Sequence, residues 1–197
     1  MVICSILLTL SLEWMGAFNN LEFSSFDHRA KFFRYDKKLH QDVVVVLIDE
    51  QSLQQMQRRF GRWPWPRSAY TDLLEFFTFA KVQSVAFDIL FSEQQAADQS
   101  GRADDDALVK ATRDAANVVH AMQLTEIFGH KSQRELPADF IKQHQIANVQ
   151  YSGKSYDNYL IPFDQLYQAA NGVGNLEIEP DSDGVYRRMR LFNQYQR

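Results

Sequence analysis

The feature that most constrains the fold is a change of pattern within residues 61–91. The stretch opens with Trp63-Pro64-Trp65-Pro66. Because proline disfavours the α conformation of the residue before it, this block should be extended. Beyond Arg67, helical spacing is shown by Tyr70, Leu73, Leu74 and Phe77, with Phe76 and Ala80 widening the stripe. The pattern predicts a helix that begins after the prolines and buries one face.

Two apolar runs flank this helix. Residues 43–48 read VVVVLI and end at Asp49, and residues 85–91 read VAFDILF, interrupted only by Asp88. Such runs are typical of strands that are buried on both faces. Strand, helix and strand form a βαβ unit, and its right-handed crossover would make the two strands parallel.

The ends of these two strands predict a ligand site. Ligands of open α/β sheets bind beyond the carboxyl ends of the strands, where Asp49 and Asp88 would lie. Trp63, Trp65 and Arg67 would form the rim, and Arg67 could pair with an anionic ligand group or with Asp88. The alternative is that both aspartates only end strands, and the residues themselves leave this open.

The rest of the chain predicts further elements around this unit. Before residue 117 they are a connecting amphipathic helix over 23–39, a helix over 51–59, a polar loop over 92–103 and a helix from Asp104. A strand over 117–124 follows, with His120 in the core, and then an excursion from the sheet over 125–155, which contains a helical turn at Phe140 and Ile141 and a strand at 146–151. The last elements are a helix over 163–170 and a hairpin whose strands 175–179 and 185–192 flank Asp183-Gly184. The sequence therefore predicts an α/β fold, with a single open, partly parallel sheet, flanking helices and a C-terminal β-hairpin.

Two groups of charged residues have both a structural and a ligand interpretation. The carboxylates of residues 104–106 favour a helix start through capping and the helix dipole, but they could also contribute to a divalent-cation site. Three arginines lie across the predicted hairpin turn from three acidic residues, so cross-strand pairing explains them without a ligand. These residues are Arg187, Arg188 and Arg190, and Glu177, Glu179 and Asp181.

Residues 1–20 begin with the uncharged apolar run MVICSILLTLSL. The run is shorter than the ~20 residues of a spanning helix, and no lysine or arginine precedes it as in a signal peptide. Three interpretations are open. It is the outer part of a membrane helix that starts before this sequence, an uncleaved signal-like anchor, or a core helix of a soluble protein.

Several segments together resemble a known family. VVVVLIDEQSL, GRWPWPRSAYTDLLEFF and VAFDILFSE, in this order, are similar to the CHASE domain of the second type, an extracellular sensory module of bacterial cyclases and histidine kinases. The similarity continues in DDALVKATRDAANVV, IPFDQLYQAANGVGNLE and DSDGVYRRMRL, so it covers most of the chain after Glu22. The Trp-Pro-Trp-Pro-Arg block is the most specific part.

The resemblance implies a sensor rather than a catalyst. Residues 1–20 would be a membrane-anchor helix, and residues 21–197 an extracytoplasmic, periplasmic sensor domain that continues beyond Arg197. The chain would pass a small-molecule or environmental signal to a cytoplasmic cyclase or kinase domain that lies outside it. It could act as a homodimer.

Composition excludes several other classes. The chain has 197 residues, enough for one well-buried domain, and its net charge of -4 with mixed signs offers no basic surface for nucleic acid. Five histidines lack zinc-site spacing, and the single Cys4 cannot form a disulfide framework. We therefore expect no metal and no cofactor, and no GxSxG or P-loop signature indicates an enzyme.

Two alternatives to a sensor remain. One is a metal-dependent hydrolase that uses Asp49, Asp88 and Asp104, which would need a nucleophile or a metal-ligating histidine near these carboxylates. The other is a dimerisation scaffold without a small ligand, which would have a filled, dry crevice.

Overall fold

The computed structural model describes residues 6, 11, 16, 18–33, 42–95, 99–125, 135–144, 154–190 and 193–195. The chain forms two compact units, residues 1–49 and residues 50–197. The strand predicted at 146–151 and most of the anchor helix predicted at 1–20 fall outside the described residues. None of the described helices is both long enough and apolar enough to cross a bilayer.

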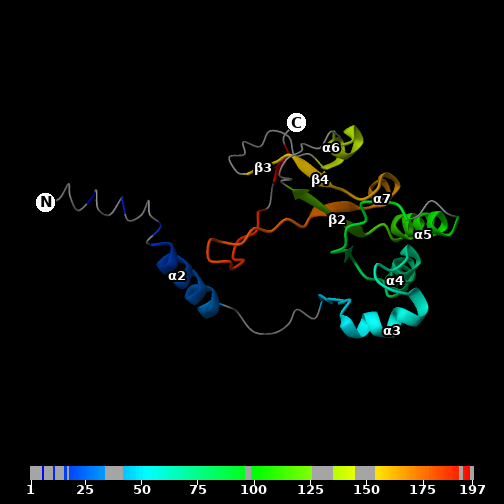
Figure 1. Ribbon diagram of the computed structural model, residues 1–197, viewed down its shortest axis with the longest axis horizontal. Helices are drawn as coiled ribbons and strands as arrows, with labels where there is room; N and C mark the ends of the chain where they lie inside the picture. The colour runs from blue at the N-terminus through cyan, green and yellow to red at the C-terminus, as the bar shows by residue number, and fades with distance from the viewer. Residues whose placement is uncertain are drawn as a thin grey trace. The chain divides into compact units, whose positions relative to one another are not determined.

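The first unit contains α2 (Asn19–Phe32), drawn in blue in Figure 1. Glu22 lies in its first turn and Arg29 and Lys31 in its last turn, an arrangement that the helix dipole favours. A helix is therefore present where one was predicted over 23–39, but it begins earlier, at Asn19, and its apolar residues do not gather on one face, so the predicted amphipathic character is wrong. The part predicted beyond Phe33 lies outside the described residues.

The apolar run at 43–48 is not the buried strand that its sequence predicts. Residues 43–49 form no regular strand, and exposure is 69% at Val43, 79% at Val44 and 71% at Leu47. Strand propensity expresses how well side chains fit a pleated, packed surface, and it forms no strand without a partner backbone. The predicted βαβ unit therefore lacks its first strand, and Asp49 does not end one.

A four-stranded mixed sheet organises the second unit (Figure 1). Its central strand β2 (Val118–Thr125) pairs in parallel with β1 (Val85–Ala86) and β5 (Gly172–Asn175), and antiparallel with β4 (Asn158–Leu160). A separate parallel pair consists of β3 (Ser155–Tyr156) and β6 (Gln194–Tyr195). The partly parallel sheet is confirmed, but the described strands form two sheets rather than one, and the 85–91 run is a strand only at its first two residues.

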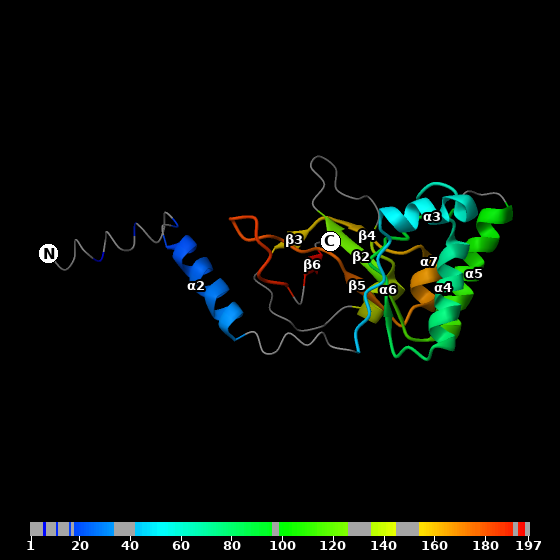
Figure 2. The ribbon, with the colours of Figure 1, turned by 90° about the horizontal axis from the view of Figure 1, so that it is seen from below.

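Helices pack around this sheet and supply much of the core. The helices of the second unit are α3 (Glu50–Phe60), α4 (Arg67–Phe79), α5 (Gln99–Ala115), α6 (Ala138–His144) and α7 (Asp164–Ala169). α5 contacts both α4 and α7, and Figure 2 shows the three helices grouped together. Their core cluster comprises Tyr70, Leu74, Val85, Phe87, Phe91, Leu108, Val109, Val118, Phe163 and Leu166.

α4 begins where the prolines predict, because Pro66 is extended with φ -62° and ψ 154° and precedes the first helical residue. Tyr70 and Leu74 are buried, and Phe77 packs against the core cluster. The predicted widening of this stripe is wrong, since Phe76 is 61% exposed and Ala80 is also exposed. The buried face of α4 is therefore narrower than its sequence suggests.

The C-terminal hairpin has its turn but not its predicted ladder. The Asp181 amide donates to the Val185 carbonyl at 3.0 Å, and the Gly184 amide to Asp181 at 2.8 Å. Residues 176–190 form no regular strands. Arg187 also forms ion pairs with Asp181 and Asp183 at 3.3 and 2.8 Å, so side chains and these two backbone hydrogen bonds together stabilise the turn.

Candidate functional site

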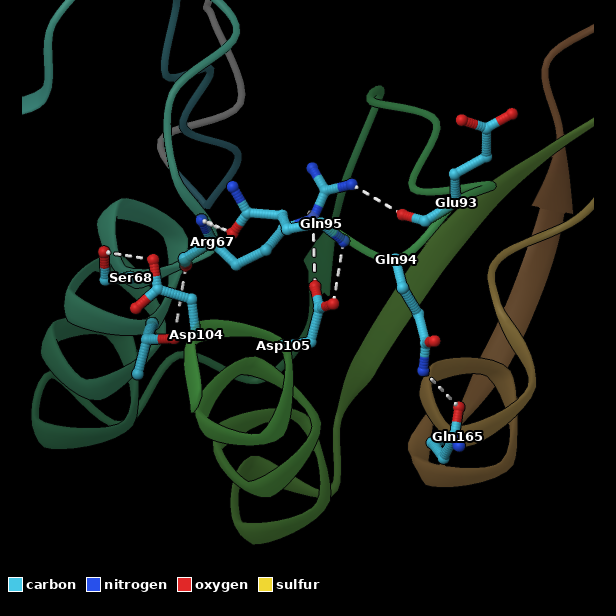
Figure 3. Close-up of polar contacts among 9 residues, drawn as sticks. Arg67, Ser68, Glu93, Gln94, Gln95, Asp104, Asp105 and Gln165 are labelled. Carbon is cyan, nitrogen blue, oxygen red and sulfur yellow. Dashed lines mark hydrogen bonds and ion pairs between the residues drawn. The ribbon is translucent and has the colours of Figure 1, made fainter. Parts of the chain in front are cut away.

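Arg67 lies at the first helical position of α4, where a backbone N–H has no partner within the helix. This N–H donates to the Gln95 side-chain oxygen at 2.9 Å. The guanidinium donates to the Glu93 carbonyl at 3.0 Å and lies 4.5 Å above the Phe91 ring. Figure 3 shows that one arginine thereby fixes the connection between β1 and α5 against the start of α4.

Asp105 is the charged partner of Arg67. Its carboxylate lies 3.6 Å from Arg67 Nε, and the two side chains are only 5% and 14% exposed. It also accepts the Gln95 backbone N–H at 2.8 Å. Burial raises the pKa of Asp105, whereas the Gln95 hydrogen bond and the Arg67 charge act to lower it. We call Arg67, Phe91, Glu93, Gln95 and Asp105 the Arg67 cluster.

The carboxylates of residues 104–106 do not cap a helix start, because α5 begins upstream at Gln99. The polar loop predicted over 92–103 is correspondingly shorter. Asp104 instead accepts a hydrogen bond from the Ser68 hydroxyl at 3.2 Å, and Asp105 pairs with Arg67, so both carboxylates tie α5 to the first turn of α4. Within the described ranges, no group of three or more His, Cys, Asp or Glu side chains could hold a metal ion.

The predicted core histidine is confirmed. His120 is fully buried in β2, and its Nε2 lies 3.2 Å from the hydroxyl of Thr112 on α5. Its ring stacks on Phe87, the residue after β1, with centroids 5.2 Å apart. Phe87 and Phe91 belong to the connection that the Arg67 cluster fixes, so the core and the candidate site share this segment.

The two tryptophans of the Trp-Pro block have different surroundings. Trp65 is 7% exposed and packs against the rings of Phe60 and Trp63 at 5.9 and 5.6 Å. Trp63 is 46% exposed. Trp65 therefore supports the segment that leads into α4, and Trp63 presents its indole to solvent.

The structure places the two predicted anchor aspartates in different units. Asp88 is exposed between the buried Phe87 and the partly buried Ile89, on the segment that the Arg67 cluster holds. Asp49 is exposed in the first unit, and its part in the site stays a prediction. The predicted pairing of Arg67 with Asp88 is not observed, because Arg67 pairs with Asp105 instead.

Sequence reasoning missed Asp105 and Gln95 as members of the site. They are far from Arg67 in sequence, and no local period marks a pairing of this range. One signal was available in the sequence, the three consecutive carboxylates of residues 104–106 in an amphipathic helix. One member of such a run is turned towards the core, and a buried carboxylate needs a cation as its partner.

Fold and site define an α/β domain whose helices surround a mixed sheet and whose connection after the edge strand is fixed by a buried ion pair. The model of the CHASE2 domain matches residues 2–196, and the chain therefore belongs to the CHASE2 domain family, a family of sensory rather than catalytic domains. This confirms the resemblance seen in the sequence. No curated protein and no solved structure matches the chain.

Proposed function

We propose that this chain is the extracytoplasmic sensory domain of a membrane-bound bacterial signal-transduction receptor. It recognises a small molecule or an environmental signal and passes it to a cytoplasmic cyclase or kinase domain outside this chain. The observation that carries the proposal is the match of the CHASE2 domain over residues 2–196. CHASE2 domains are generally extracellular sensory domains of membrane receptors.

The proposed ligand face is the connection after β1 together with the start of α4. Asp88 and Trp63 are its contact residues, because both are exposed and offer a carboxylate and an indole. Arg67 and Trp65 are positioning residues, since their side chains are largely buried and already engaged.

The Arg67 cluster offers a route from this face to the helices. Asp88 lies three positions before Phe91, whose ring stacks under Arg67, and Asp105 fixes Arg67 to α5. A ligand that prefers one arrangement of residues 87–95 would therefore bias the packing of α4 on α5. Such a differential preference is what a conformational signal requires.

A reporter chimera tests this function in living bacteria. The whole chain is placed before the membrane helix and kinase of a receptor with a measurable output, and the cells are exposed to a panel of small molecules. We expect a compound that changes the output of the wild-type chimera to lose its effect in Asp88→Asn and in Trp63→Ala. Asp114→Asn is the matched control, because Asp114 is 58% exposed on α5 and forms an ion pair with Lys110 on the same helix.

Two results would count against the proposal. A response that survives in Asp88→Asn and Trp63→Ala, with normal receptor levels, would place the ligand elsewhere on the domain. A response that is lost equally in Asp114→Asn would show that the chimera reports general damage rather than recognition.

A further inference from the structure

His120 is a titratable group enclosed by the apolar core. It is 0% exposed and pairs with Val173 of β5, one residue beyond the last pair of β2 with β1. Its ring stacks parallel to that of Phe87, with centroids 5.2 Å apart and an interplanar angle of 3°. The edge of Phe91 approaches it at 5.7 Å with an angle of 76°. Two sides of the ring are therefore covered by aromatic carbon.

The polar atoms of the His120 ring are incompletely satisfied. Nε2 is 3.2 Å from the buried hydroxyl of Thr112, while Nδ1 has no hydrogen-bond partner in the described part of the chain. A neutral ring needs one donor and one acceptor partner, whereas a protonated ring has two donors and a charge. The site therefore suits the neutral ring and disfavours the imidazolium ion.

The ionisable groups on the surrounding elements do not compensate a charge on His120. Burial is the one cause of the His120 pKa shift, and no charged group contributes to it. The described residues of β1 and β5 include no ionisable group, and the groups on the other elements are Arg67, Tyr70, Asp72 and Glu75 on α4, Asp88 and Glu93 on the connection after β1, and Arg102, Asp104, Asp105, Asp106, Lys110, Arg113 and Asp114 on α5. Asp105 is already engaged by Arg67 and by the Gln95 amide. Burial alone lowers the pKa of His120 from 6.5 to about 4.

We propose that His120 is an acid-sensitive switch which, on protonation, releases the segment from Phe87 to Gln95 from the core. A charge on the fully buried His120 would lack solvation and would leave Nδ1–H without an acceptor, so protonation favours an arrangement in which the ring or the segment packed on it has moved. Phe87 is the stacking partner, and Phe91 supports the Arg67 guanidinium at 4.5 Å. The same displacement would loosen the Arg67 cluster.

This inference concerns regulation of the proposed ligand face and so rests on the proposed function for its meaning. The position of the exposed Asp88, and of the segment from Phe87 to Gln95 that carries it, would then depend on external pH. Acidification would weaken ligand recognition by disordering the segment that carries Asp88, or would itself act as the signal. The physical claim can be tested on the purified chain without any ligand, so its failure would leave the proposed function standing.

The direction of the effect follows from the two protonation states. In the unfolded chain His120 titrates near 6.5, and in the folded chain near 4, so the unfolded state binds more protons between these values. Stability is unaffected above pH 6.5 and falls as the pH drops towards 4. From pH 7 to pH 5, this group alone should raise the unfolding equilibrium constant on the order of 20-fold.

Equilibrium unfolding at pH 5 and pH 7 provides the first test. We expect the unfolding equilibrium constant to rise from pH 7 to pH 5 in wild type, and to rise on the order of 20-fold less in His120→Gln. Gln keeps a polar group towards Thr112 but cannot titrate. The double variant His120→Phe with Thr112→Val removes both polar partners and serves if His120→Gln folds poorly. An equal loss of stability in wild type and a folded variant would overturn the proposal.

Hydrogen exchange tests the segment itself. Three amides report on it: Phe87, which donates to Val119, Gln95, which donates to Asp105, and Phe163, which donates to Phe91. After correction for the intrinsic pH dependence of exchange, their protection should fall between pH 7 and pH 5 in wild type and not in His120→Gln. The Asp181 amide in the hairpin turn is the control. Equal changes at Asp181 and at the three reporters would show general loosening and contradict a local switch.

Discussion

Replacing Arg67 by alanine is the sharpest test of how the candidate site is held. The substitution removes three interactions at once: the hydrogen bond to the Glu93 carbonyl, the stacking on Phe91 and the ion pair to Asp105. It leaves the Asp105 carboxylate, which is only 5% exposed, without its cation. We therefore expect Arg67→Ala to be strongly destabilising.

The expected loss comes from the buried charge that remains. Removing one partner of a buried ion pair costs ~3–5 kcal/mol. Two features favour the lower end of this energy range. Arg67 is still 14% exposed, and burial already raises the pKa of Asp105, so that its carboxyl group can take up a proton when the arginine is removed. A loss of ~3 kcal/mol corresponds to a decrease in Tm of roughly 6–12 °C for a domain of this size.

Denaturant titration and calorimetry of matched variants measure this effect. Arg59→Ala is the control, because Arg59 forms an ion pair with Asp72 on α4 that is shorter, at 2.6 Å against 3.6 Å, but the two side chains are 64% and 53% exposed. That pair should contribute only ~0–1 kcal/mol. Arg67→Lys should also destabilise, since an ammonium group cannot reproduce the planar stack on Phe91. A loss in Arg67→Ala no larger than that in Arg59→Ala would refute the reasoning.

Two further predictions concern exposed and buried apolar groups. Trp65→Ala should cost ~3–5 kcal/mol in a denaturant titration, and Trp63→Ala clearly less, because Trp65 is 7% and Trp63 46% exposed; the reverse order would contradict the structural role of Trp65. The exposed apolar run at 43–48 should promote self-association, so Val44→Lys should lower the weight-average mass in analytical ultracentrifugation. A mass that does not change with Val44→Lys would contradict this.

Local patterns predicted the helices well. α3, α4, α6 and α7 each follow a short-range signal, such as the prolines before Arg67 or the apolar pair Phe140 and Ile141 inside α6. Helical hydrogen bonds are made within the element, so the residues that form it also carry its signal. α5 is the exception at its start, where the polar residues from Gln99 gave no apolar period.

Strands and the site depended on partners that sequence does not reveal. The run at 43–48 has a stronger strand pattern than Gly172–Asn175, yet only the latter pairs with β2. The same holds for Arg67, because its residue type and position indicated a rim, whereas its actual partner Asp105 comes from a later helix. The sequence predicted Asp88, Trp63 and Trp65 as candidates alike. Only the packing of the folded chain shows that Asp88 and Trp63 are exposed whereas Trp65 is buried.

The location of the domain outside the cytoplasm is the central claim, and labelling in intact cells tests it most directly. Cys4 is the only cysteine, so Cys4→Ser with Ser182→Cys places a single thiol in the exposed turn after Asp181. With the receptor expressed in bacteria, a thiol reagent that cannot cross the inner membrane should label this cysteine before lysis, and Cys4→Ser alone should stay unlabelled. Labelling that appears only after lysis would place residue 182 in the cytoplasm and contradict the account.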